Sequence, residues 1–206
     1  MSDNAALIGG FVIIRYTVAM QDDIDKVLFG TDRIATRVAE LGREIMDAYG
    51  ERADSITIVP IMTGAMIFAA DLIRQLPARL KINLMTVSSY PGASIRTQGS
   101  KILEQQLGDV HGRHVLLIDD ILDSGGTLKL VIPTLKKLGA ADVHTCVLLR
   151  KDRETAREVE VDFVGFDIPD EFVIGYGLDY DNLYRNLPSI CTLKKEVYAP
   201  EAAVTP

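Results

Sequence analysis

Hydrophobic residues recur along this chain with two different periods, and the first marks a long helix. From Thr31 to about Tyr49 an apolar residue returns every three or four positions, which gives a helix one apolar face. The residues of that face are Ile34, Val38, Leu41, Ile45 and Met46. Gly50 follows directly and is placed to end the helix. The 20 residues at the start of the sequence are expected to form a strand or an arm.

Continuous apolar and β-branched runs make up the second pattern, and such runs are typical of strands buried on both faces. They predict strands at 55–61, 81–90, 115–118 and 143–149, and two short strands at 162–166 and 172–176. Helices are expected around 66–73 and 126–138, and Pro133 should bend the second helix or fix its first turn. Strands that alternate with helices predict an α/β fold, a mostly parallel twisted sheet flanked by helices.

The composition of the chain makes some classes of function improbable. The 206 residues suit one domain, and 22 Lys and Arg against 29 Asp and Glu give a formal charge of -7. An acidic chain is a poor candidate for non-specific nucleic-acid binding. No apolar run is long enough to span a membrane, and Asp3 stands where a signal peptide carries basic residues. We expect no nucleic-acid or membrane partner.

The two cysteines, Cys146 and Cys191, lie in apolar runs. Buried, reduced thiols are favoured over a disulfide or a metal site, and they suit a cytoplasmic protein.

Ligands of parallel sheets lie beyond the carboxyl ends of the strands, so the turn after strand 115–118 is the first candidate site. It reads Asp119-Asp120-Ile121-Leu122-Asp123-Ser124-Gly125-Gly126-Thr127. Glycine N–H groups, a helix N-terminus and two hydroxyls suit a phosphate. The three carboxylates of this turn would repel a phosphate alone. They make sense if the ligand also carries a sugar diol and arrives with Mg²⁺. For Asp123 or Ser124 alone, a helix N-cap explains the residue equally well.

This string resembles the phosphoribosyl-diphosphate signature of type I phosphoribosyltransferases. The resemblance implies that Asp119 and Asp120 hold the ribose 2- and 3-hydroxyls. Asp123 would lie beside the purine five-membered ring as proton acceptor or donor. The 5-phosphate would be held by Ser124, Gly125, Gly126 and Thr127. The family often has Glu-Asp where this chain has Asp119-Asp120, so the shorter Asp119 reaches the diol less directly.

Residues 161–180 are strongly similar to the hood of the hypoxanthine–guanine branch of that family. The similarity implies that Phe172 stacks on the purine and that the backbone of Val173 reads the ring edge. Lys151 would donate to the purine 6-oxo group, and Arg185 would reach the diphosphate. Mg²⁺ would be held by Asp179, Asp119 and Asp120. Taken singly, Phe172 is more typical of a core residue and Lys151 of a solvated surface charge, and Asp179 is compatible with a turn acid; their joint match to the family favours the site.

Two further segments match the same branch. Thr63-Gly64 stands where a short loop holds the diphosphate, often with a cis peptide before the glycine, although many members have Lys in place of Thr63. A simple tight turn would explain this segment too. Ser89 and Tyr90 match a Ser-Tyr pair in the family's mobile lid, which excludes water during the reaction. The alternative for that segment is an ordinary polar loop.

The resemblance covers roughly residues 25–195. It implies one domain over 1–206, with a core at about 30–150 and a base-binding hood at about 151–195 plus the N-terminal segment. The implied activity is Mg²⁺-dependent transfer of phosphoribosyl from 5-phosphoribosyl 1-diphosphate to hypoxanthine or guanine, in a homodimer or homotetramer. Two alternatives stay open: a regulator that senses the activated ribose, and a transferase for adenine, orotate or uracil.

Overall fold

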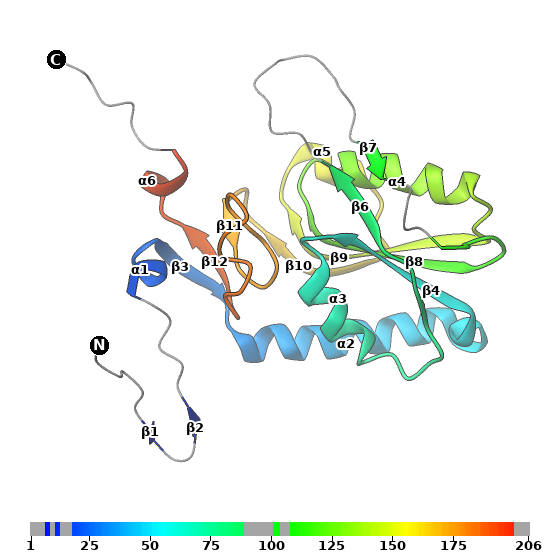
Figure 1. The fold of residues 1–206 in the computed structure, drawn as a ribbon, viewed down its shortest axis with the longest axis horizontal. Coiled ribbons are helices and arrows are strands. Elements are labelled where there is room, and N and C mark those ends of the chain that lie inside the picture. The colour runs from blue at the N-terminus through cyan, green and yellow to red at the C-terminus, as the bar shows by residue number, and fades with distance from the viewer. Residues whose placement is uncertain (1–6, 9–10, 13–17, 89–100, 104–107, 200–206) are drawn as a thin grey trace.

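A computed structural model of the chain describes residues 7–8, 11–12, 18–88, 101–103 and 108–199 (Figure 1). Its largest sheet is built from β4 (Ile56–Met62), β5 (Lys81–Ile82), β6 (Met85–Ser88), β7 (Lys101–Leu103), β8 (His114–Leu122), β9 (Asp142–Lys151) and β10 (Phe163–Ile168). The strand order is β10-β9-β8-β4-β6-β7, with β5 beside β4. Every pair is parallel except β6 with β7. The expected mostly parallel α/β sheet is confirmed.

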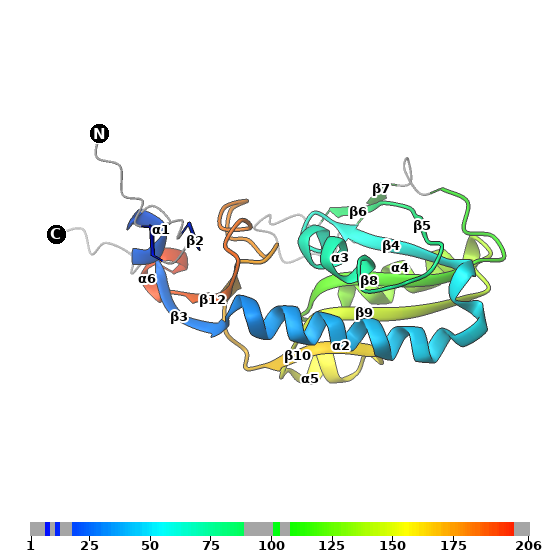
Figure 2. The same ribbon diagram turned by 90° about the horizontal axis from the view of Figure 1, so that it is seen from below.

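Helices cover both faces of this sheet because its central strands are apolar on both sides. Helices α2 (Thr31–Tyr49) and α3 (Met66–Ile73) bury their apolar residues in one core, together with Leu116 and Ile118 of β8. Helix α4 (Gly126–Lys137) shares the opposite core with Val115 and Leu117 of the same strand. Alternate residues of β8 thus point to opposite faces. Helix α2 has the bounds that its apolar stripe predicted, and Figure 2 shows it running along the sheet.

Two details differ from the sequence-based expectations. The single strand expected at 81–90 is wrong, because β5 and β6 are separate strands. Both pair with β4 in one register, Lys81 opposite Thr57 and Met85 opposite Ile61. Between them the N–H of Asn83 donates to the carbonyl of Ile58 at 2.9 Å. Pro133 lies inside α4 rather than in its first turn, so the first-turn alternative is wrong.

A second, antiparallel sheet of three strands lies apart from the main sheet (Figure 1). Its order is β11 (Val173–Ile174), β12 (Ile190–Leu193) and β3 (Ile24–Phe29). The sheet joins a segment near the start of the chain to the C-terminal third. The strand expected at 172–176 is shorter than predicted, and β3 and β12 were not predicted. The strand expected at 162–166 is β10, so the main sheet continues past residue 150.

The remaining described segments are short. A two-stranded hairpin of β1 (Leu7–Ile8) and β2 (Phe11–Val12) precedes α1 (Val18–Asp22). A 3-10 helix follows α2 at Gly50–Ser55, and two single-turn helices are α5 (Glu154–Arg157) and α6 (Lys195–Tyr198). Both cysteines are free and buried, as expected. Within the described ranges, every helix is too short or too polar to cross a membrane.

One partly buried hydrogen bond ties the segment after β11 to helix α3, which packs on the main sheet. After β11 the chain turns through Tyr176, whose hydroxyl donates to Asp71 Oδ2 of helix α3 at 2.6 Å. Tyr176 is buried and belongs to the same core as α2 and α3. The loop that follows β11 is therefore fixed against the main sheet at the end where the strands terminate.

Candidate active site

A cleft of about 500 Å³ opens at the carboxyl ends of β4, β6 and β8. It collects predicted residues from three separate loops. They are Thr63, Gly64, Asp119, Asp120, Asp123, Thr127, Asp179 and Arg185. Thr86 and Val87 of β6 complete one wall. The predicted lid residues, Ser89 and Tyr90, follow β6 directly but lie outside the described residues.

The paired carboxylates of Asp119 and Asp120 lie at the inner end of this cleft. The N–H of Asp120 donates to Asp119 Oδ1 at 3.0 Å, and the N–H of Ile121 donates to Asp120 Oδ1 at 2.9 Å. Burial raises the pKa of Asp119 well above its ordinary value, and the neighbouring charge of Asp120 raises it further. Burial also raises the pKa of Asp120. A buried acid beside a partly buried one suits a ligand that brings hydroxyl donors or a cation.

The turn after β4 is shaped to accept Asp120. A side chain on Gly64 would place its Cβ only 1.8 Å from Asp120 Oδ2, so glycine is required there. Gly177 presses on the same turn, because a Cβ there would lie 2.4 Å from the carbonyl oxygen of Gly64. The structure has one cis peptide in its described part, between Met62 and Thr63, one bond before the Thr63-Gly64 bond.

The phosphate turn runs from Ser124 into the first turn of α4. Its N-cap is Gly125, in the left-handed region with φ of 75°, and no side chain caps the helix. Asp123 and Ser124 are therefore not N-cap residues. The first N–H groups of α4 have no partner within the helix and are open to an anion. Thr127 lines the cleft, whereas Ser124, Gly125 and Gly126 are not part of its lining.

Asp179 and Arg185 form the wall opposite these loops. Arg185 Nη2 lies 2.7 Å from Asp179 Oδ1, and Arg185 Nη1 donates to the carbonyl of Gly177 at 2.7 Å. The N–H of Asn182 donates to Asp179 Oδ2 at 2.8 Å. Each carboxylate oxygen of Asp179 thus has a partner, and the side chains of Asp179 and Arg185 are held in place.

Preformed metal cages are absent from the described part of the chain, since no three His, Cys, Asp or Glu side chains there are close enough to share an ion. The carboxylates of Asp119, Asp120 and Asp179 still suit Mg²⁺, which prefers oxygen ligands. Mg²⁺ commonly takes one or two carboxylates and fills its other positions with water and substrate phosphates. The donor set fits that kind of site.

Four charged side chains form a group at the edge of the cleft: Asp123, Lys151, Arg153 and Asp170. Lys151, at the end of β9, is 7% exposed, so it is not a solvated surface charge. Its Nζ lies 3.7 Å from Asp123 Oδ2 and 3.5 Å from Asp170 Oδ1. Arg153 contacts the same two acids at 2.5 Å each, through Nη1 and Nη2. Arg153 and Asp170 were not predicted, and the only sequence signal was their place in polar turns after two strands.

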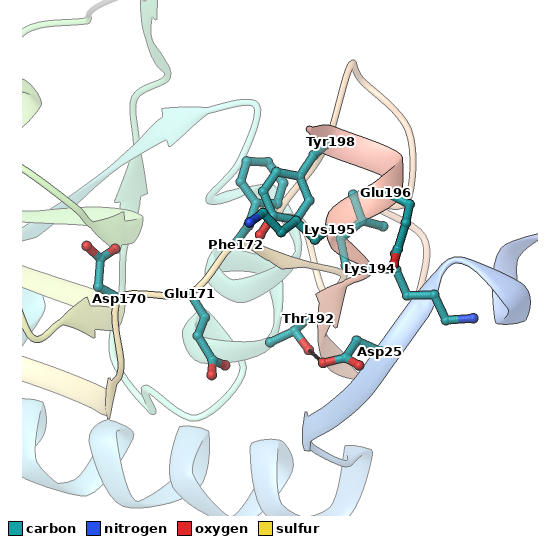
Figure 3. Close-up of a pocket in the computed structure, with 10 residues that line it drawn as sticks. Asp25, Asp170, Glu171, Phe172, Thr192, Lys194, Lys195, Glu196 and Tyr198 are labelled. Carbon is teal, nitrogen blue, oxygen red and sulfur yellow. Dashed lines mark hydrogen bonds between the residues drawn. The ribbon is translucent and has the colours of Figure 1, made fainter. Parts of the chain in front are cut away.

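Phe172 lies in a second cavity, of about 460 Å³, which also contains Asp170 and residues of β12 and α6. Figure 3 shows its ring stacked on that of Tyr198, with centroids 4.9 Å apart and planes inclined by 16°. Tyr180 meets the ring edge-on at 5.6 Å. Phe172 is only partly buried, and its neighbour Val173 is buried in β11. Arg153 bridges the two cavities, because Asp123 lines one and Asp170 the other.

Comparisons with known proteins agree with these features. The family described as "Phosphoribosyl transferase domain" matches residues 28–181. A hypoxanthine-guanine phosphoribosyltransferase of Mycobacterium avium is 40% identical over 180 residues, which are 85% of this chain and 89% of that protein. The bifunctional protein TilS/HprT of Listeria monocytogenes (serotype 4b, strain F2365) is 40% identical over 193 residues. These are 91% of this chain but 30% of the Listeria protein. A hypoxanthine phosphoribosyltransferase structure from Staphylococcus aureus has a TM-score of 0.82 at 37% identity, covering 90% of this chain and 100% of that one.

The substitution Asp119→Asn should stabilise the ligand-free protein. The raised pKa of Asp119 means that ionisation costs folding free energy. That cost grows as the pH rises from the unfolded-state pKa to the higher folded-state pKa, and it is complete above the latter. Asn keeps the acceptor for the Asp120 N–H and carries no charge. We expect melting in metal-free buffer to rise by roughly 2 °C or more at about pH 8, and by less at about pH 5.

The matched control is Asp47→Asn, because Asp47 is an exposed acid on α2. It should leave the melting temperature unchanged at either pH. A lower melting temperature for Asp119→Asn near pH 8 would contradict the assignment of a buried, repelled carboxylate.

Proposed function

The chain belongs to the phosphoribosyltransferase family, and on that premise we propose that it is a purine salvage enzyme. It transfers phosphoribosyl from 5-phosphoribosyl 1-diphosphate to hypoxanthine or guanine, and releases IMP or GMP and diphosphate. The proposal rests on one observation. The paired acids, the phosphate turn and the Asp123–Lys151 contact lie together at the carboxyl ends of the central strands.

The ribose phosphate binds between β8 and α4. The open N–H groups of the first turn of α4, with the hydroxyls of Ser124 and Thr127, hold the 5-phosphate, and the N-terminal end of the helix favours its charge. Asp119 and Asp120 accept hydrogen bonds from the ribose hydroxyls. Binding at the phosphate fixes the reacting carbon, so binding energy far from the chemistry serves orientation.

The diphosphate occupies the opposite wall. Among the described residues, four aspartates line the cleft, Asp119, Asp120, Asp123 and Asp179, whereas Arg185 is the one cationic side chain of that described lining. A highly anionic substrate therefore needs a cation to bind here. Mg²⁺ would be held by one or two carboxylates of the set Asp179, Asp119 and Asp120 together with substrate oxygens and water, and when bound it would neutralise charge on the leaving diphosphate. Thr63 and Gly64 contribute backbone groups, and the missing family lysine leaves Arg185 as the positive contact.

The purine lies next to the charged group. Lys151 donates to the 6-oxo oxygen, and an ammonium cannot accept a hydrogen bond from the amino group of adenine. Asp123 exchanges the proton of the five-membered ring. Phe172 stacks on the purine plane, and the backbone of Val173 contacts the ring edge. Orotate and uracil have no five-membered ring for Asp123 to meet.

The proposal also extends to the hood, the cellular compartment and the oligomeric state. The small sheet and the loops after β10, within the expected 151–195 and together with the N-terminal segment, serve as the hood over the base. The core reaches beyond the expected 30–150 to include β10. The enzyme works in the cytoplasm as a homodimer or homotetramer. Buried free thiols support a reducing compartment.

Nucleotide formation tests the function directly. Purified protein is mixed with phosphoribosyl diphosphate, Mg²⁺ and one base at a time: hypoxanthine, guanine, xanthine or adenine. We expect turnover with hypoxanthine or guanine and none with adenine. Asp123→Asn should lower kcat by about 10²–10⁴-fold, because it removes the proton acceptor. Asp47→Asn is the control and should keep full activity. Tight binding of phosphoribosyl diphosphate without turnover of any purine would favour a sensor.

Gly64→Ala tests the place of the diphosphate. The new Cβ would displace the carboxylate of Asp120 and the turn itself. Affinity for phosphoribosyl diphosphate with Mg²⁺, measured by titration calorimetry, should fall at least about tenfold, or about 1.4 kcal/mol. Gly30→Ala is the matched control, because a Cβ at Gly30 has no atom within 4 Å and its φ of -78° suits alanine. Unchanged affinity in Gly64→Ala would place the diphosphate elsewhere.

A further inference from the structure

The side chain of Asp123 has few partners that could fix its orientation. It follows the end of β8 and is 46% exposed. Its contacts within the described residues are with two cations, Lys151 at 3.7 Å and Arg153 at 2.5 Å. In the proposed reaction Lys151 must face the 6-oxo group, and its contact with Asp123 is long. Arg153 is therefore the partner that can hold the carboxylate while a purine is bound.

The Arg153 contact fixes Asp123 without blocking it. The guanidinium approaches Asp123 Oδ1 closely, yet no donor in the described part of the chain meets this oxygen with hydrogen-bond geometry. Oδ1 is buried beneath the guanidinium and is held there by charge, so Oδ2 of this 46% exposed side chain, 3.7 Å from Lys151 Nζ, is the oxygen that can accept a proton from the purine. A proton acceptor needs this combination, because an unheld carboxylate rotates away and a fully hydrogen-bonded one is a weak acceptor.

Arg153 is itself held by a second contact, with Asp170. Its Nη2 lies 2.5 Å from Asp170 Oδ1, and this contact is the main reason that the pKa of Asp170 lies below and that of Arg153 above the ordinary value. The backbone fixes both partners. The N–H of Asp152 donates to the carbonyl of Ile168 at 2.8 Å, which ties the loop of Arg153 to the end of β10, two residues before Asp170.

We propose that Arg153 and Asp170 are positioning residues for the proton transfer at Asp123. Asp170 orients the guanidinium of Arg153, and Arg153 orients the carboxylate of Asp123 toward the purine ring. A base held by a second group, which is oriented by a third, is a common arrangement in enzymes. This inference rests on the proposed function, because it takes from it the role of Asp123. Neither residue forms or breaks a bond.

The test is a set of single and double variants followed by steady-state kinetics. Arg153→Gln should lower kcat about 10- to 100-fold while the KM of hypoxanthine changes less than about threefold, since orientation and not binding is lost. Asp170→Asn should lower kcat by a smaller factor. Arg153→Lys keeps one charge and should fall between Arg153→Gln and the unaltered enzyme. Arg157→Gln is the matched control, because Arg157 in the same helical turn pairs with exposed Asp152.

The double variant gives a readout that a merely structural role would not produce. In the Asp123→Asn background, Arg153→Gln should cause no further loss of kcat, because it acts through Asp123 alone. Losses that multiply in the double variant, a change confined to KM, or full kcat in Arg153→Gln would each overturn the inference. These results are distinct from failure of the proposed function, in which the unaltered protein itself forms no nucleotide. Affinity for IMP shows that each variant is folded.

Discussion

Two adjacent carboxylates at the end of a buried strand are the constraint around which this molecule is built. Asp119 and Asp120 lie in the carboxyl-terminal half of strand β8 (His114–Leu122) at the centre of the sheet, and burial opposes the ionisation of both. Gly64 has no side chain because Asp120 occupies that space, and Gly177 is small because Gly64 in turn lies against it. A cluster that costs folding free energy persists where a ligand needs it, since the hydroxyls and cation of that ligand satisfy the charge.

The rest of the cleft depends on joining two separately built parts. The main sheet supplies the paired acids and the phosphate turn, whereas the segments around the small sheet supply Phe172, Asp179 and Arg185. A partly buried hydrogen bond from Tyr176 to α3 and the ionic bridge through Arg153 connect these parts. The ionic bridge ends at Asp123 in the cleft, and the two connections together explain how residues far apart in sequence meet around one substrate.

The sequence predicted the features that local pattern determines. The apolar stripe of α2 and the continuous runs of β4, β8 and β9 depend on burial alone, and the phosphate turn is contiguous, so each could be found before the fold was known. Strand β3 was missed because its pattern does not alternate cleanly, and β12 because it is short. The roles of Arg153 and Asp170 were missed because charged residues in turns resemble a solvated surface until the fold brings them together. The stacking of Tyr198 on Phe172 likewise depends on tertiary contact.

The central claim is that one end of the sheet binds both halves of a purine nucleotide, the phosphate at α4 and the base at Lys151. A crystal structure of the protein with IMP tests it most directly. The account predicts the 5-phosphate within hydrogen-bond distance of Thr127 and of the first N–H groups of α4, with the 6-oxo oxygen at Lys151 Nζ and the ring on Phe172. A nucleotide whose phosphate lies away from the 124–127 turn, or whose base lies away from Lys151, would contradict it.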